Sequence, residues 1–68
     1  MPWRTITAQQ YVENNDPDGF DEARIVCPDG VTREIWDAGF DGEGDVVVIH
    51  TAMPKEFIVA LEAPIRVR

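Results

Sequence analysis

Apolar and polar residues alternate on either side of one turn sequence, and this pattern predicts a β-hairpin over about residues 22–37. The turn is Cys27–Gly30, where proline suits the second position of a type I turn and glycine supplies the positive φ of a bulge. If Cys27 lies opposite Val31, the two strands share one mainly apolar face, formed by Ala23, Ile25, Cys27, Val31, Arg33 and Ile35. The same register places Arg24 opposite Glu34 on the other face, a favourable cross-strand pair.

Two further apolar runs and a short tail predict the remaining strands. The run at residues 45–51 is β-branched and apolar at both alternating positions, which indicates a central strand covered on both faces. In residues 56–62 the larger side chains share one face, formed by Phe57, Val59 and Leu61. In residues 65–68 two aliphatic residues alternate with two arginines after Pro64. We therefore expect a short edge strand whose charges discourage further pairing.

Thr7 and Gln10 have the spacing of a capping box, which predicts a helix over about residues 8–14. The apolar positions of this helix form one narrow stripe, made of Ala8, Tyr11 and Val12. A helix of about two turns is unstable in isolation, so we expect it to pack against the sheet. Residues 4–7 are expected to be extended or irregular, and the alternative is a strand over Arg4–Ala8.

These elements predict one small domain over residues 1–68, of the α+β class and mainly β. A short N-terminal helix would precede a four- to five-stranded antiparallel meander, curled into a small barrel-like structure or a sandwich. The strands are expected at about residues 22–27, 31–37, 45–51, 56–62 and 65–68. A domain of this size buries only about 60% of its unfolded surface. The sequence is therefore compatible with a monomer or with a homodimer stabilised by its interface.

Negative charge is concentrated in the middle of the chain. The formal net charge is −7, and residues 13–45 contain eleven acidic residues against two arginines. This distribution disfavours direct binding of nucleic acid, because phosphate contacts require clustered lysine and arginine. It favours docking on a basic surface of a partner protein, which the negative charge would attract. Solubility alone is the simpler explanation of the same charge.

The candidate binding segment follows the predicted hairpin. Residues 37–45 contain three glycines and four carboxylates, those of Asp37, Asp41, Glu43 and Asp45, and we expect a solvent-exposed loop. Trp36 and Phe40 are candidate contact residues, since a few exposed aromatic side chains often dominate binding energy. The alternative for Trp36 is burial beneath the N-terminal helix. We favour burial because a marginal core needs its large aromatic residues.

Two acidic segments resemble parts of a calcium-binding loop. Positions 1, 3, 5 and 6 of that loop are matched by Asn14, Asp16, Asp18 and Gly19. The bidentate acid required at position 12 is replaced by Ile25, and a loop that starts at Asp37 has Val48 there. The sequence therefore predicts no metal site.

Cys27 and His50 are the only candidates for a thiol nucleophile and its base. The predicted register places Cys27 on the apolar face, where a cysteine behaves as a small unreactive hydrophobe. No further convergent groups are apparent, so we predict no catalytic residues, no cofactor and no enzymatic activity.

The sequence favours a small acidic, non-enzymatic binding protein. Small acidic domains include phage-encoded inhibitors that mimic nucleic-acid phosphates, an analogy of composition alone. The main alternative is a structural or assembly subunit of a virion or larger complex, joined through sheet edges; a small enzyme or calcium-binding module is a distant third. No apolar run reaches the about 18 residues of a membrane span. The first residues lack the apolar core of a signal peptide, and with a single cysteine this predicts the cytoplasm, that of the host if the protein is phage-encoded.

Overall fold

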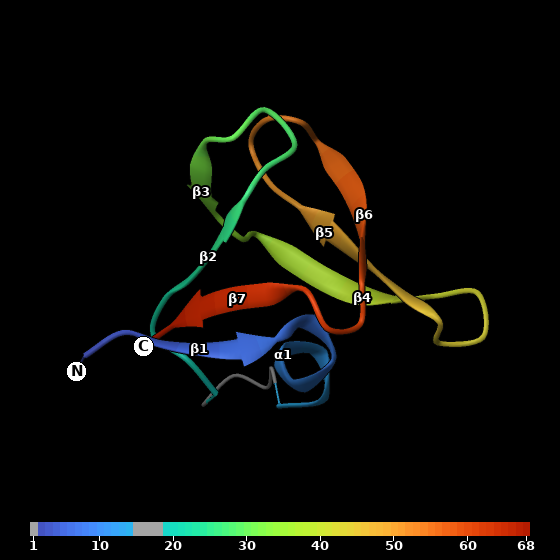
Figure 1. Cartoon of the computed structure of the whole chain (residues 1–68), viewed down its shortest axis with the longest axis horizontal. Helices are drawn as coiled ribbons and strands as arrows, with labels where there is room; N and C mark the ends of the chain where they lie inside the picture. The colour runs from blue at the N-terminus through green and yellow to red at the C-terminus, as the bar shows by residue number, and fades with distance from the viewer. Residues whose placement is uncertain (1, 15–18) are drawn as a thin grey trace.

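A computed structural model describes residues 2–14 and 19–68 of the chain (Figure 1). The elements in these residues are β1 (Arg4–Thr7), α1 (Ala8–Asn14), β2 (Ala23–Val26), β3 (Thr32–Glu34), β4 (Asp37–Asp41), β5 (Val46–His50), β6 (Glu56–Ala60) and β7 (Pro64–Val67). The strands form two antiparallel sheets. The first sheet has the order β1-β7-β2-β3, and the second sheet has the order β4-β5-β6. The predicted class, mainly β with one short helix, is confirmed.

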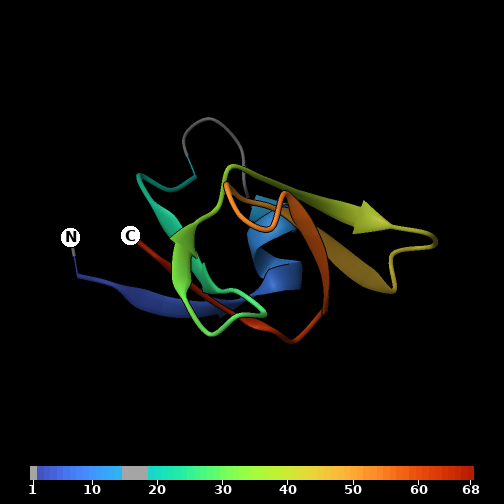
Figure 2. The ribbon, with the colours of Figure 1, turned by 90° about the horizontal axis from the view of Figure 1, so that it is seen from above.

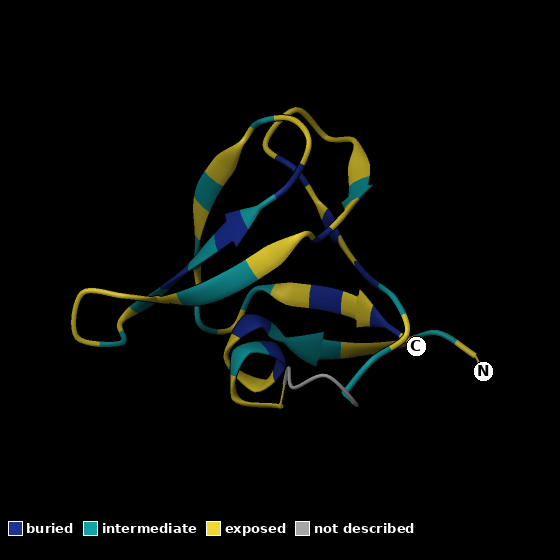
Figure 3. Cartoon of the chain, turned by 180° about the vertical axis from the view of Figure 1, so that it is seen from behind, coloured by how far each residue is buried: buried dark blue, intermediate teal, exposed yellow. Residues whose placement is uncertain are grey.

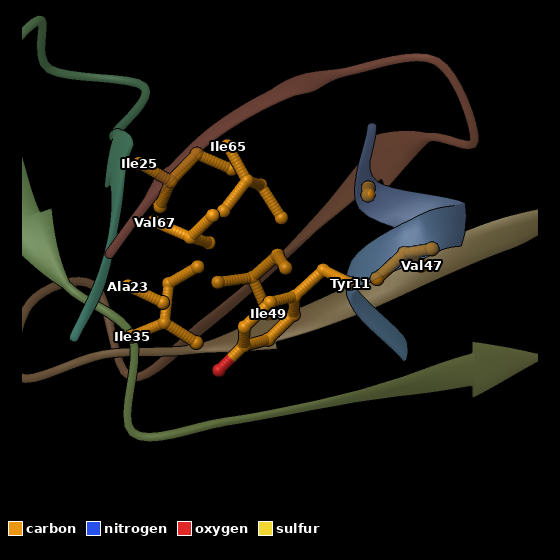
Figure 4. Close-up of a cluster of buried hydrophobic side chains, with 9 residues drawn as sticks. Tyr11, Ala23, Ile25, Ile35, Val47, Ile49, Ile65 and Val67 are labelled. Carbon is orange, nitrogen blue, oxygen red and sulfur yellow. The ribbon is translucent and has the colours of Figure 1, made fainter. Parts of the chain in front are cut away.

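The core lies between the two sheets, and α1 contacts strands of both (Figures 1 and 2). Side chains from both sheets point toward one another around Ile49 (Figure 4). The core cluster consists of Ala8, Tyr11, Ala23, Ile25, Ile35, Val47, Ile49, Ile65 and Val67. Buried and less buried residues alternate along β2, β5 and β7 (Figure 3), because successive side chains of a strand point to opposite faces of its sheet.

The capping box forms as predicted. The backbone amide of Thr7 donates to Gln10 Oε1 at 3.0 Å, and the amide of Gln10 donates to Thr7 Oγ1 at 3.1 Å. The next amide, that of Ala8, donates to the carbonyl of Ala63 at 2.8 Å and ties the start of the helix to the segment before β7. The cap therefore fixes both the helix start and the point where the preceding strand ends.

Residues 4–7 form a strand as well as leading into the helix. Strand β1 pairs antiparallel with β7, with Ile6 opposite Ile65. Strand β7 also pairs with β2, so it lies inside the first sheet. The prediction of an edge strand at residues 65–68 is therefore wrong. The arginines point away from the core while the backbone on both sides of β7 is paired, and the sheet order departs from a simple meander.

The hairpin around Gly30 has the predicted register. Arg24 is the partner of Glu34, and the amide of Cys27 donates to the carbonyl of Val31 at 2.9 Å. Gly30 has a φ of 85°, and its amide donates to the carbonyl of Cys27 at 2.8 Å. A positive φ at this position strains any residue with a Cβ atom, so glycine closes the turn at least cost.

The predicted strand at residues 31–37 is divided between the two sheets. The amide of Ile35 donates to the carbonyl of Ala23 in the first sheet at 2.9 Å, and the amide of Trp36 donates to the carbonyl of His50 in the second sheet at 2.8 Å. Because Asp37 is also the register partner of His50, two residues oppose one, which is the pattern of a β-bulge. The bulge bends the chain and lets it pass from one sheet to the other.

Two expectations about the second sheet need correction. Residues 37–41 are strand β4, so the predicted acidic loop at residues 37–45 is reduced to the turn at residues 42–45. Strand β5 is central, but only its inward residues, Val47 and Ile49, are fully buried. Val48 on the outer face is half-buried, because the three strands form one wall of the core and their outer face meets solvent.

Two further sequence-based points concern metals and membranes. The half-motif for calcium includes Asp16 and Asp18, which lie outside the described residues. Within residues 2–14 and 19–68, no group of three or more His, Cys, Asp or Glu side chains is arranged to hold a metal ion. No helix in the same residues is long and apolar enough to cross a membrane.

Candidate functional site

The acidic candidate residues lie on the hairpin formed by β4 and β5, which extends from the body of the molecule away from both termini (Figures 1 and 2). Strand β4 pairs with β5 from Asp37 opposite His50 to Asp41 opposite Val46. The turn between them is closed by a hydrogen bond from the amide of Gly44 to the carbonyl of Asp41 at 3.0 Å. Asp37 and Asp41 are therefore carried on paired backbone, which holds their spacing more firmly than a loop would, and the other two carboxylates lie in a turn closed by a hydrogen bond.

All four predicted carboxylates are exposed. Asp37 Oδ1 accepts a hydrogen bond from the amide of Ala38 at 2.9 Å, and Asp41 Oδ1 accepts one from the amide of Gly42 at 2.8 Å. Asp37 and Asp41 are four positions apart, so they lie on the same face of β4, opposite to the face of Ala38 and Phe40 that meets Ile49 and Val47. The remaining two, Glu43 and Asp45, belong to the turn at the tip of the hairpin. The negative charge of the candidate segment is therefore concentrated on the outer face of β4 and at the tip of the β4–β5 hairpin.

Asp37 also lies close enough to the helix to affect a buried side chain. The pKa of Tyr11 is raised above its usual value, first by burial of the phenol and second by the negative charge of Asp37. Both effects disfavour the phenolate. Tyr11 is only 5% exposed and stacks on Phe20, with the ring centroids 5.7 Å apart. The base of the acidic hairpin is therefore attached to the core, while its tip is surrounded by solvent.

Trp36 is 68% exposed, so the favoured expectation that it is buried under the helix is wrong. The helix instead places Tyr11 in the core, and the bulge opposite His50 turns Trp36 out at the junction of the two sheets. Phe40, opposite Val47 in the hairpin, is 44% exposed. The structure thus leaves both aromatic candidates accessible at the two ends of β4.

The outer face of the second sheet adds Val48, Glu56 and Ile58, which the sequence did not identify as candidate site residues. A shallow groove is lined by Asp41, Val48, Glu56, Phe57 and Ile58. Ile58 is 61% exposed and lies directly opposite Val48. Exposed apolar side chains beside carboxylates are typical of protein-docking surfaces. The signal was present in the sequence, since β5 is apolar at both alternating positions and the core needs only one of its faces.

The candidate catalytic pair is not assembled. Cys27 is 3% exposed and follows β2 in the first sheet, whereas His50 belongs to β5 in the second. The nearest acid to His50 is across the ladder: its Nδ1 lies 3.9 Å from Glu56 Oε2. Cys27 is buried as predicted, and such a thiol is inert unless an activating base reaches it.

The hairpin, Trp36 and the groove place exposed carboxylates beside exposed aromatic and apolar side chains. No protein-family model, curated protein or solved structure matches this chain. Its function is therefore inferred from its own residues.

Proposed function

We propose that the protein is a non-enzymatic binding protein whose acidic hairpin docks on a basic surface of a partner protein. The observation that carries the proposal is the β4–β5 hairpin itself. It holds two exposed carboxylates on the paired strand β4 and two more in the turn at its tip, extends into solvent, and has the 68% exposed Trp36 at its base. A surface of this kind steers a cationic partner by charge and anchors it by aromatic contact.

A mimic of nucleic-acid phosphates is the specific form of this proposal. Such a mimic needs negative charges at fixed intervals on a stiff support, and the antiparallel pairing of β4 with β5 supplies one. Enzymes that handle DNA or RNA carry basic surfaces of the required kind. An inhibitor would occupy that surface without needing a catalytic group. A single buried cysteine supports a reducing compartment such as the cytoplasm as its place of action.

Assembly into a larger complex is the second candidate. It is favoured by the outer face of the second sheet, where the exposed Ile58 of the edge strand β6 lies opposite the half-buried Val48 of β5. An edge strand presents unpaired backbone groups to which another chain can add. Assembly would depend on these two apolar side chains and respond weakly to salt, whereas acidic docking would weaken steeply as salt rises.

The test is affinity capture of the partner from a lysate of the source cell, with elution by a salt gradient. The same capture is repeated with a quadruple variant, D37N, D41N, E43Q and D45N. These amides keep the acceptor oxygens that bond the backbone and remove only the charge. We expect about a tenfold loss of affinity or more at low salt, because several exposed charge pairs of up to about 1 kcal/mol are removed together.

The matched control removes four exposed carboxylates elsewhere, with E13Q, D21N, E34Q and E62Q. This control changes the net charge equally but leaves the hairpin intact, so it should retain most of the affinity. Equal losses in the two variants would show that net charge alone matters. Unchanged binding by the hairpin variant, with a flat salt response, would contradict the proposal.

A further inference from the structure

Two arginines lie directly opposite each other on the outer face of the first sheet. Arg24 of β2 is the register partner of Arg66 of β7, and both side chains are exposed. The row continues on either side, with Thr5 opposite Arg66 and Glu34 opposite Arg24. Like charges directly opposite one another in a sheet are destabilising. This chain, with a net charge of −7, nevertheless places two of its six basic residues together.

Trp3 and Glu22 hold the neighbouring guanidinium groups in place. The guanidinium carbon of Arg24 lies 5.3 Å from the ring centroid of Trp3, and that of Arg68 lies 4.7 Å from it. Glu22 pairs with both arginines, at 3.4 Å from Arg24 Nη2 and by a hydrogen bond from Arg68 that lowers the pKa of the carboxyl group. Arg66 has no ion-pair partner among the described residues. One guanidinium of the opposed pair is therefore left to bind something else.

These side chains border a common cleft of about 180 Å³, which is lined by Trp3, Arg24, Thr32 and Arg66. We propose that this arginine cleft binds the phosphate group of a small phosphomonoester. Guanidinium groups match the geometry of phosphate oxygens, and Arg66 supplies the positive charge that no ion pair among the described residues offsets. The hydroxyl of Thr32, which also lines the cleft, supplies a further donor.

The overall negative charge of the chain does not prevent this binding. The acidic hairpin and the two termini lie at opposite ends of the molecule, whose longest extent is 32 Å (Figure 1). Exposed charges are screened within about 8 Å at physiological salt. Within the described residues Glu22 offsets Arg24 and Arg68, whereas Arg66 has no ion-pair partner. The arginine cleft therefore keeps one uncompensated guanidinium and is separate from the acidic hairpin.

Binding can be followed by the fluorescence of Trp3. The substitution W36F leaves Trp3 as the single tryptophan, and it changes a side chain that is outside the core. Inorganic phosphate, a nucleoside 5′-monophosphate and the parent nucleoside are titrated separately, with chloride added to equal ionic strength. We expect a saturable change with both phosphates in the millimolar range and none with the nucleoside. The arginine side-chain NMR signals of the same W36F protein give a second readout of the titration.

The decisive variant is R66Q, made in the same background. It removes one of the opposed charges, so it should raise the melting temperature in phosphate-free buffer and weaken phosphate binding by about tenfold. The control K55Q removes one positive charge from the segment between β5 and β6 and should bind phosphate normally. Succinate, a dianion without phosphorus, is titrated as a further control. The assignment would be overturned if phosphate and chloride gave equal responses, or if R66Q and its parent bound phosphate equally. It would also be overturned if the nucleoside alone bound, or if succinate bound more tightly than phosphate.

Discussion

The backbone amide of Trp36 donates a hydrogen bond to the carbonyl of His50, at 2.8 Å. This bond marks the position where the chain leaves the first sheet and enters the second. It also accounts for the exposure of Trp36, since the bulge opposite His50 turns the indole out of the core at the base of the acidic hairpin. One local distortion therefore places the main aromatic candidate next to the carboxylates.

Replacing Trp36 with alanine should leave stability almost unchanged, within about 0.5 kcal/mol, because a largely exposed side chain contributes little to the core. The same variant should weaken binding to the captured partner by about tenfold or more if Trp36 is an anchor of the docking surface. Urea unfolding and a binding titration measure the two effects. The comparison variant is Ile49→Ala, at a fully buried position of β5. We expect this variant to lose about 2–5 kcal/mol of unfolding free energy. A large loss of stability in W36A would contradict the observed exposure.

Replacing any one acidic residue of the hairpin alone should change the affinity for the partner very little. An exposed charge pair contributes about 0–1 kcal/mol, so D41N or E43Q by itself should change affinity little. The association rate of the wild-type complex should nevertheless fall steeply as salt rises, because the four charges steer the encounter together. Stopped-flow or biosensor association rates at several ionic strengths provide the measurement. A single substitution that abolished binding would instead identify one buried, specific contact.

Cys27 should react with a thiol reagent only when the protein unfolds. The side chain is 3% exposed at the end of β2, and the reagent needs access to the sulfur. Labelling with a chromogenic disulfide reagent should therefore be slow in buffer and fast in denaturant. Its rate in buffer should rise in the destabilised I49A variant, because that variant opens more often. Rapid labelling of the native wild-type protein would show that the turn opens locally.

The turn of the first hairpin should contribute to acid sensitivity through Asp29. Its pKa is lowered first by a hydrogen bond from Arg33 at 2.9 Å and second by the amide of Val31 at 3.1 Å. Because the folded pKa lies below the unfolded one, the stabilisation is present above about pH 4, the usual range of an aspartate, and is lost as pH falls through the lowered value. D29N should therefore flatten the decline of the unfolding free energy in acid.

A double-variant cycle tests this assignment. R33Q removes the partner and should flatten the same part of the pH profile, and the combination of D29N with R33Q should add little to either change. Thermal or urea unfolding between acid and neutral pH gives the profiles. Additive effects of the two substitutions would show that Asp29 and Arg33 act through separate interactions.

The sequence determined what depends on neighbouring residues. Turn chemistry fixed the hairpin around Gly30 and the pairing of Arg24 with Glu34, because proline and glycine select the turn and the turn sets the register. The Thr7–Gln10 cap was readable for the same reason, since both hydrogen bonds span three residues. The acidic residues of the candidate site could also be identified, but their setting on a paired strand could not.

Only the tertiary structure decided which strands became neighbours. The alternation of apolar and polar residues shows which face of a strand is buried, but it does not show which segment pairs with the edge of that strand. The insertion of β7 between β1 and β2 was therefore not predictable. The exposure of Trp36 follows from a bulge that needs His50 from another strand, and the arginine cleft joins Arg24 and Arg66, which are far apart in the chain. These features arise from backbone hydrogen bonds between distant segments, which form only where the buried faces of all the strands can meet in one core.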